Sequence, residues 1–241
     1  MRILITNDDG IHASQLVPLV KWAQKLGDVM VAAPKVEQSG KSHGIEIHKA
    51  FEVKQVELLP GVRAYAVDST PADCVRFAVL GLREQFDLVI SGINRGLNIG
   101  TDIMYSGTVA AILEAAALGI QGVALSTTPG FYENALEHLD RVWGYVERHE
   151  LLAKHGLYNI NIPDQAGEIR ITHQGGPYYS DDFFPGENDI WQPVGKSVYK
   201  RAEDFDVDTD AVLTGGFISI TPLTVERTEM QVFHSLRTLN A

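Results

Sequence analysis

Cysteine and long apolar runs are scarce in this chain. Cys74 is the only cysteine among 241 residues, so no internal disulfide can form and a reducing compartment is compatible with the sequence. No stretch approaches the roughly 20 apolar residues that cross a bilayer. Met1 and Arg2 lead directly into a strand-like run, without the pattern of a cleavable leader. We therefore expect a cytoplasmic protein with no membrane partner.

Positive charge is also scarce. The chain has 20 Lys and Arg against 31 Asp and Glu, which gives a formal net charge of -11. A protein that coats nucleic acid or an anionic membrane needs a basic face, so we expect no nucleic-acid polymer as a partner. Hydrophobic residues make up 45% of the chain, enough for a sizeable core. An acidic protein can still bind a small phosphorylated molecule if a metal ion supplies the positive charge.

Strand-like runs alternate with helical patterns in the first two-thirds of the chain. Such alternation predicts an α/β fold with a mostly parallel sheet covered by helices. The expected strands are residues 2–6, 29–33, 64–67, 88–91, 123–127 and 159–162. The expected helices are residues 15–26, 109–118 and 136–148, and another begins at 69–73 with a Thr cap followed by Pro.

The pattern changes after residue 163. Helical periodicity fades, and glycine, proline, aromatic and acidic residues accumulate between Gln174 and Gly195. Residues 217–221 are a late strand candidate, and the acidic run from Glu203 to Asp210 is expected to be a solvated loop. We predict a catalytic core in residues 1–163. Residues 164–241 would form a β-rich extension and a C-terminal oligomerisation segment within one domain.

The most informative motif is Asn7-Asp8-Asp9-Gly10, directly after the first expected strand. Neighbouring strand residues point to opposite faces, so two adjacent carboxylates can aim at one point only if the chain bends there. Gly10 permits that bend. Two carboxylates held this close repel each other and lose hydration, which predicts a positive charge between them. A divalent cation is the simplest candidate.

Two further polar loops follow expected strands and should lie at the same edge of the sheet. One carries Ser39, and the other carries Asn94 and Asn98 before it reaches the start of a helix. A helix start with free backbone N–H groups and hydroxyls favours an anion, and this one reads Ser106-Gly107-Thr108. Oxygen donors suit Mg²⁺ or Mn²⁺. A cation beside a phosphate cradle is typical of metal-assisted phosphate ester hydrolysis.

These motifs resemble the SurE family of survival-protein nucleotidases. The resemblance spans most of the chain in the right order. It rests on residues 3–10, 38–40, 70–75, 91–94, 105–108, 159–163, 209–211 and 219–223. One stretch departs from the usual family pattern, because residues 182–191 keep only its aromatic character.

The resemblance implies a divalent-metal-dependent phosphatase acting on nucleoside 5′- and 3′-monophosphates, and possible activity on short polyphosphate. One ion per subunit, Mg²⁺ or Mn²⁺, would be bound by Asp8, Asp9, Ser39 and Asn94. The phosphate would be bound by Asn98, Ser106, Gly107 and Thr108. The implied fold is a Rossmann-like three-layer αβα sheet with a β-rich C-terminal part exchanged between subunits of a homodimer or homotetramer.

Several alternatives remain open from the sequence. Attack by water is the preferred mechanism, with Asp8 and Asp9 as the catalytic pair, but Asp8 could instead be a general base or nucleophile. A nucleotide- or phosphate-sensing protein without turnover would carry the same site. A metal-dependent nucleotide-sugar transferase would need a second nucleotide-binding half, for which the chain is short. Cys74 lies in a helical pattern and is expected to be a core residue, and His43 receives no role.

Overall fold

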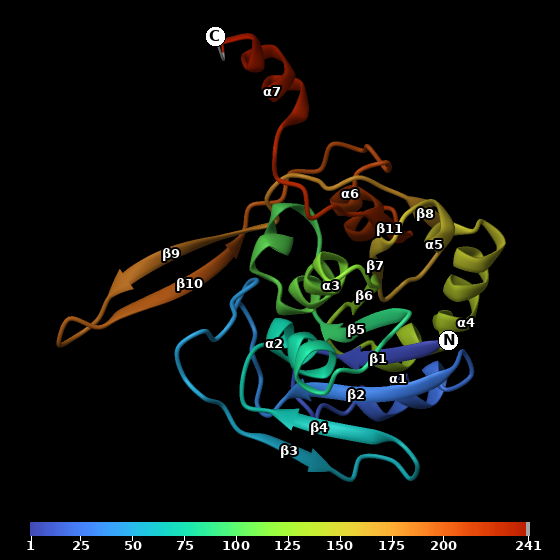
Figure 1. Ribbon diagram of the computed structural model, residues 1–241. Helices are drawn as coiled ribbons and strands as arrows, with labels where there is room; N and C mark the ends of the chain where they lie inside the picture. The colour runs from blue at the N-terminus through green and yellow to red at the C-terminus, as the bar shows by residue number, and fades with distance from the viewer. Residues whose placement is uncertain (240–241) are drawn as a thin grey trace.

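A computed structural model describes residues 1–239 of the chain. Six neighbouring strands run parallel in the centre of one sheet (Figure 1). In chain order they are β1 (Arg2–Thr6), β2 (Asp28–Pro34), β4 (Arg63–Val67), β5 (Leu88–Arg95), β6 (Gln121–Thr127) and β7 (Leu157–Ile162). The edge strand β3 (Val53–Val56) is antiparallel to β4, and β11 (Ile218–Pro222) is antiparallel to β7. The other edge strand, β8 (Ile169–Ile171), pairs parallel with β11. The order across the sheet is β3-β4-β2-β1-β5-β6-β7-β11-β8.

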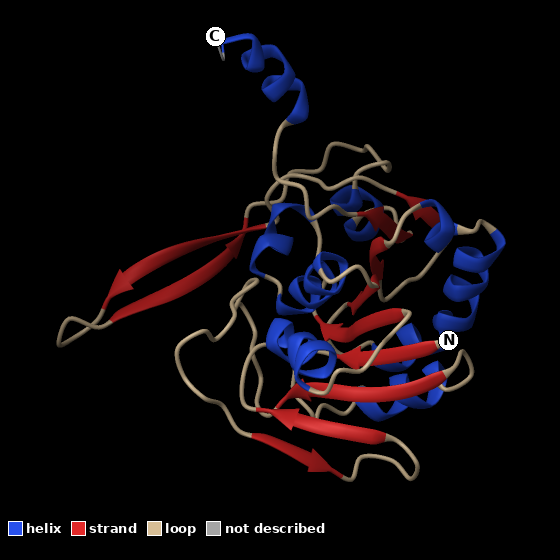
Figure 2. Cartoon of the chain, viewed as in Figure 1, coloured by secondary structure: helices blue, strands red, loops and turns tan. Residues whose placement is uncertain are grey.

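Helices cover both faces of the sheet, which makes three layers (Figure 2). On one face lie α1 (Leu16–Ala23), α4 (Tyr132–Arg148) and α5 (Leu151–Lys154), which pack in one apolar cluster with Ile3 and Ile5 of β1. On the other face lie α2 (Pro71–Arg76) and α3 (Gly107–Ala117), which pack with Leu4. Because both faces are covered, β1 is buried from Ile3 to Thr6, as expected for a central parallel strand.

The α/β prediction is confirmed, including a mostly parallel sheet. The predicted cap is also present, since the Thr70 hydroxyl accepts a hydrogen bond from the backbone N–H of Asp73 at 3.1 Å. Cys74 is fully buried in the core, as predicted. The sequence missed β3, the π-helical turn η1 (Phe77–Gly81), the 3₁₀ turn η2 (Gly100–Tyr105) and the extension of β5 beyond residue 91.

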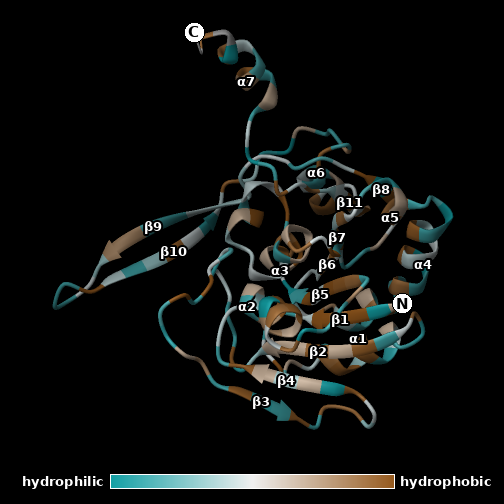
Figure 3. Cartoon of the chain, viewed as in Figure 1, coloured by the Kyte–Doolittle hydropathy of each residue, from teal (hydrophilic) through white to brown (hydrophobic). Residues whose placement is uncertain are grey.

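After residue 163 the chain contributes β8 and β11 to the sheet and then leaves it. A hairpin of β9 (Tyr179–Pro185) and β10 (Trp191–Ser197) extends away from the body, with hydrophobic residues towards its tip (Figure 3). The helix α7 (Met230–Leu236) also projects from the body, followed by the turn η3 (Arg237–Leu239). No helix among residues 1–239 is long and apolar enough to cross a membrane.

The prediction of a solvated acidic loop at 203–210 is wrong for its last residues. Asp208 and Asp210 are buried at the start of α6 (Asp208–Leu213). Asp208 accepts hydrogen bonds from the backbone N–H groups of Gly100 and Gly175, at 3.0 and 2.8 Å. These hydrogen bonds offset part of the cost of burying the carboxylate, although burial still raises the pKa of Asp208.

Candidate active site

The strand order reverses its direction at the centre of the sheet. The chain begins at β1, moves outward through β2 and β4, and returns to β5 on the other side of β1. The carboxyl ends of β1 and β5 therefore border the point where the winding direction reverses. In open α/β sheets ligands bind at this point. The acidic pair follows β1, and the Asn94 loop follows β5.

The turn after β1 is fixed by Asn7. Its side-chain Oδ1 accepts a hydrogen bond from the Gly10 N–H at 3.0 Å, and its Nδ2 donates to the Gly10 carbonyl at 3.0 Å. Gly10 has φ +99°, a backbone conformation that other residues rarely adopt. Asp8 and Asp9 lie inside this turn, so both carboxylates are held at the end of β1.

Asp8 is buried, with 4% of its surface exposed, and it contacts the start of α3. The Thr108 hydroxyl donates a hydrogen bond of 2.6 Å to Asp8 Oδ1. A Cβ atom at Gly107 would lie 3.0 Å from Asp8 Cβ and 3.1 Å from Pro71 Cγ. Glycine therefore lets α3 begin close to the acidic turn without crowding it.

Asp9 is half-buried and links three segments. Gln15 Nε2 donates to its Oδ2 at 2.5 Å, and the backbone N–H of Arg95 donates to the same atom at 3.3 Å. The ends of β1 and β5 thus meet at this carboxylate.

Burial raises the pKa of both acids. The pKa of Asp8 lies above its usual value because of burial, although the hydrogen bond from Thr108 lowers it in part. Burial, together with the negative charge of Asp8, raises the pKa of Asp9 to about 6. The fold therefore holds two carboxylates where their charged forms are disfavoured, which is the arrangement expected around a bound cation.

Ser39 lies on an exposed loop, where it contacts Glu37. Its hydroxyl donates to Glu37 Oε1 at 2.6 Å. The negative charge of Glu37 contributes to the raised pKa of both Asp8 and Asp9. The backbone N–H of Gln38 donates to the carbonyl of Asp8 at 2.7 Å, which fixes the start of this loop against the end of β1.

Asn94 follows an irregularity in β5. The pairing of β5 with β6 shifts between Ser91 and Asn94. At Gly92, with φ +138°, a Cβ atom would lie only 2.3 Å from the carbonyl oxygen of Leu125. The bulge redirects the end of the strand. Asn94 then donates Nδ2 to the Gly96 carbonyl at 2.8 Å and is half-buried.

Asn98 is buried, and its side chain and backbone contact other protein groups. Its Nδ2 donates to Ser126 Oγ at 2.8 Å. Its backbone N–H donates to Asn161 Oδ1, and its carbonyl accepts from the side chains of Asn159 and Asn161. The side-chain amide thus serves to fix the loop that follows β5.

Ser106 begins α3 and is buried. Its hydroxyl accepts the backbone N–H of Val109 at 3.1 Å and so caps the helix. The backbone N–H groups of the first helical residues, Gly107 and Thr108, have no carbonyl one turn earlier within the helix. They and the helix dipole favour an anion beside Asp8.

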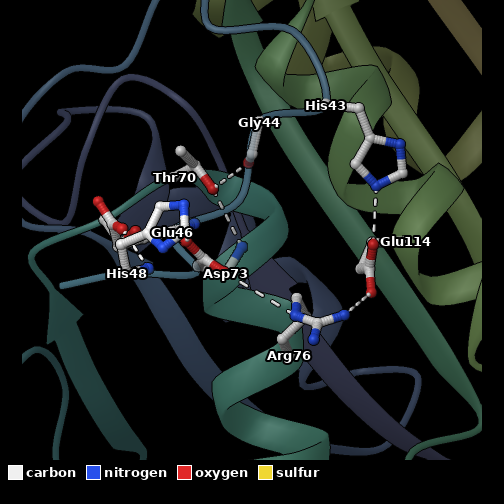
Figure 4. Close-up of polar contacts among 9 residues, drawn as sticks. His43, Gly44, Glu46, His48, Thr70, Asp73, Arg76 and Glu114 are labelled. Carbon is white, nitrogen blue, oxygen red and sulfur yellow. Dashed lines mark hydrogen bonds and ion pairs between the residues drawn. The ribbon is translucent and has the colours of Figure 1, made fainter. Parts of the chain in front are cut away.

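The loop that carries Ser39 is anchored to both α2 and α3 by a charged network (Figure 4). His43 Nε2 lies 2.8 Å from Glu114 Oε2, and Arg76 Nη1 donates to Glu114 Oε1 at 2.9 Å. The Asp73 carboxylate accepts the backbone N–H of Glu46 at 2.8 Å and lies 3.9 Å from Arg76 Nε. These contacts hold an otherwise irregular loop against two helices.

The donors near the acidic pair are oxygen atoms of carboxylate, hydroxyl and amide groups. Among residues 1–239, no three His, Cys, Asp or Glu side chains gather in a way that could hold a metal ion. A thiolate or imidazole metal centre therefore has no support in this part of the chain. Two carboxylates with a nearby hydroxyl and amide fit a hard divalent cation that keeps several water ligands, as Mg²⁺ does.

Sequence reasoning missed four neighbours of the acids: Gln15, Glu37, Arg95 and Tyr132. Burial raises the pKa of Tyr132 to about 12, and the charge of Asp9 adds to this shift. The positions of Glu37 and Arg95, beside Ser39 and Asn94, are a signal that the sequence did contain. Nothing in the sequence marked Gln15, which directly precedes α1, or Tyr132, which begins α4.

Comparison with known proteins gives a consistent result. The family model described as "Survival protein SurE" matches residues 3–181. A relative named 5'-nucleotidase SurE from Paramagnetospirillum magneticum is 40% identical, and the alignment covers 99% of this chain and 95% of the relative. One of the same name from Thermoanaerobacter sp. (strain X514) is 37% identical, with 98% and 97% covered. The crystal structure of the SurE protein from Aquifex aeolicus is similar as well, with a TM-score of 0.79 and 28% sequence identity. The alignment covers 100% of this chain and 100% of that protein's chain.

Proposed function

This chain belongs to the SurE family and is a nucleotidase of the phosphoric monoester hydrolase class, and we propose that it hydrolyses nucleoside 5′-monophosphates with the help of one divalent cation. The products would be the nucleoside and inorganic phosphate. Activity on 3′-monophosphates and on short polyphosphate is part of the same proposal.

One observation carries the proposal. Asp8 and Asp9 lie side by side at the carboxyl end of β1, next to the point where the strand order reverses, and burial raises the pKa of both. Two carboxylates kept in this state favour a cation over water as their neighbour. We assign the metal to Asp8, Asp9, Ser39 and Asn94, with Mg²⁺ or Mn²⁺ as the ion. When bound, the ion would polarise the phosphoryl group and lower the pKa of a bound water.

The chain's own groups would position the substrate. The N-terminus of α3 would bind the phosphate through the backbone N–H groups of Gly107 and Thr108, next to Asp8. Ser106 fixes this helix start as its cap, and Asn98 holds the preceding loop in place. Asp9 would orient the attacking water, and Asp8 could instead act as a general base or nucleophile.

We also propose that the protein is a homodimer or homotetramer in the cytoplasm. Residues 164–241 would supply the subunit contacts. The exposed aromatic and aliphatic side chains of the hairpin and α7 support this, because an isolated two-stranded hairpin is at best marginally stable in water.

Phosphate release from a panel of nucleoside monophosphates tests the proposal directly. We expect turnover in Mg²⁺ or Mn²⁺ that is lost in EDTA. Asp9→Asn should abolish release while the far-UV circular dichroism spectrum stays unchanged. Near-normal turnover of Asp9→Asn at saturating metal would show that the ligand assignment is wrong.

A further inference from the structure

A cavity of about 390 Å³ lies at the carboxyl ends of β5 and β6. It is bounded by the loops that follow these strands, by the end of η2, and by the residues that lead into the hairpin. Its lining includes Gly96, Tyr105, Thr128, Tyr178, Tyr179 and Asp181. Gly96 directly follows Arg95, whose backbone N–H contacts Asp9. The cavity and the acidic pair therefore lie at the same edge of the sheet, and the loop after β5 connects them.

The charge of the lining decides which part of a nucleotide can enter. Asp102 and Asp181 both line this cavity, and no Lys or Arg is among its lining residues in the described part of the chain. A phosphate would be repelled by two carboxylates in such a space. A nucleoside has no negative charge, and its hydroxyl and amino groups can donate hydrogen bonds to a carboxylate.

Three tyrosines supply the apolar walls. Tyr178 and Tyr179 contact each other edge to face, with ring centroids 4.7 Å apart. The backbone N–H of Tyr179 donates to Asp102 Oδ2 at 2.7 Å, which fixes this wall to η2. Tyr105 has 62% of its surface exposed, a large value for an aromatic ring beside a cavity. Base–aromatic stacking is the usual use of such rings in binding nucleotides.

A second cavity, of about 450 Å³, lies along the flank of α3 and fits the nucleoside less well. Its lining includes Val109, Leu113, Leu223 and Arg227, and Ser106 is the residue it shares with the proposed phosphate site. Among the described residues that line it, the imidazole of His43 is the only aromatic ring available for stacking. Glu226 and Arg227 both line it, so charge does not decide what it binds, and the lack of tyrosine rings is what disfavours a base.

We propose that the tyrosine-lined cavity binds the nucleoside of the substrate, with Tyr105 stacking on the base and Asp181 accepting its hydrogen bonds. This inference rests on the proposed nucleotidase function and names the part of the site that recognises the nucleoside. Asp181 lies at the end of the family match, and Tyr178 and Tyr179 also lead into the divergent hairpin.

Two measurements test the inference. The first is binding of uncharged adenosine and cytidine to the metal-free protein, measured by ligand-observed NMR. The second compares kcat/KM for the corresponding nucleoside 5′-monophosphates with kcat/KM for ethyl phosphate, which has no nucleoside. Tyr105→Ala should weaken nucleoside binding by about tenfold and lower the nucleotide to ethyl phosphate ratio by a similar factor. Asp181→Asn should lower both quantities in the same direction by about threefold.

Met104→Ala is the matched control. Met104 precedes Tyr105 in η2, has 68% of its surface exposed, and lines the other cavity. Met104→Ala should change neither the nucleoside affinity nor the nucleotide to ethyl phosphate ratio. Equal losses on both substrates in Tyr105→Ala, or no nucleoside binding by the wild type, would overturn the inference. If the protein binds nucleosides through Tyr105 but hydrolyses no phosphate ester, the cavity assignment stands and the proposed function fails.

Discussion

Asp9 destabilises the metal-free fold when it is charged, although the proposed metal binding needs that charge. Its pKa rises from the usual 3.8 to about 6 because it is partly buried beside Asp8. Between these two values the folded protein binds more protons than the unfolded chain does. Without metal, the free energy of unfolding must therefore fall as the pH rises from about 4 to about 6. A cation between the carboxylates would remove this instability.

We expect metal-free Asp9→Asn to be more stable than the wild type at pH 7. Two pKa units correspond to about 3 kcal/mol, and solvent screening of this partly exposed group should reduce the gain to about 1 kcal/mol. The gain should vanish near pH 4, where the wild-type carboxyl is protonated. Urea denaturation in EDTA at several pH values measures this difference.

Two controls accompany that measurement. Added Mg²⁺ should stabilise the wild type and leave Asp9→Asn almost unchanged. Asp140 has its pKa lowered by hydrogen bonds from Lys25 and Trp22, so Asp140→Asn should give no gain at pH 7. A metal-free Asp9→Asn protein that is less stable than the wild type at pH 7 would contradict the electrostatic account.

At the scale of elements, the loop between β2 and β3 depends on Glu114 of α3. This carboxylate is 9% exposed as a side chain, and its pKa is lowered mainly by the hydrogen bond with His43 and also by Arg76. Glu114→Gln keeps the shape but removes the charge that both partners face. We expect a loss of about 1–3 kcal/mol in the free energy of unfolding, and faster hydrogen exchange in residues 42–49.

The same variant should also weaken metal binding. Ser39 lies on this loop, so a mobile loop places its hydroxyl less well near the acidic pair. We expect Mn²⁺ affinity, measured by calorimetry, to fall several-fold. Glu147→Gln is a suitable control, because Glu147 lies on α4 and accepts a hydrogen bond from Trp143 at the surface. Unchanged hydrogen exchange in Glu114→Gln would show that the network does not hold the loop.

The elements that the sequence predicted are those buried on both faces. The central parallel strands are nearly continuous apolar runs, so they can be recognised without knowing which strands they pair with. The edge strand β3 has Lys54 and Gln55 at its centre, and the hairpin strands are exposed throughout. Their sequences look like loops, because pairing with a neighbour rather than burial makes them strands.

The residues of the site also fall into two groups, those that the sequence revealed and those that only the structure revealed. Motifs that lie within one loop could be found by inspection, and the switch point explains why the loops after β1 and β5 meet at Asp9. The ligand assignments stay predictions. The links of Asp9 to Gln15 and of His43 to Glu114 join residues on different elements. Such pairs depend on how helices pack, which the spacing along one chain does not contain.

At the scale of the whole molecule, the hairpin and α7 expose several large apolar side chains, and exposed apolar surface of this kind marks interaction sites where it is contiguous. Both project from the body in the same structure (Figure 1). The hairpin exposes Phe183, Phe184 and Trp191, each with more than half of its surface in solvent. On α7, Phe233 and Leu236 are exposed as well. This surface would be buried if each element packed against a second copy of the chain.

We expect the wild type to be a dimer or tetramer at micromolar concentration, as measured by sedimentation velocity. Replacing both Phe183 and Phe184 by Ser should convert a tetramer to a dimer, or a dimer to a monomer, because the contacts between subunits lose two aromatic side chains. Phe233→Asp should have an independent effect through α7. Leu80→Ser removes a partly exposed apolar side chain from η1 and should leave the assembly unchanged. A wild type that sediments as a monomer would show that these projecting elements serve something other than self-association.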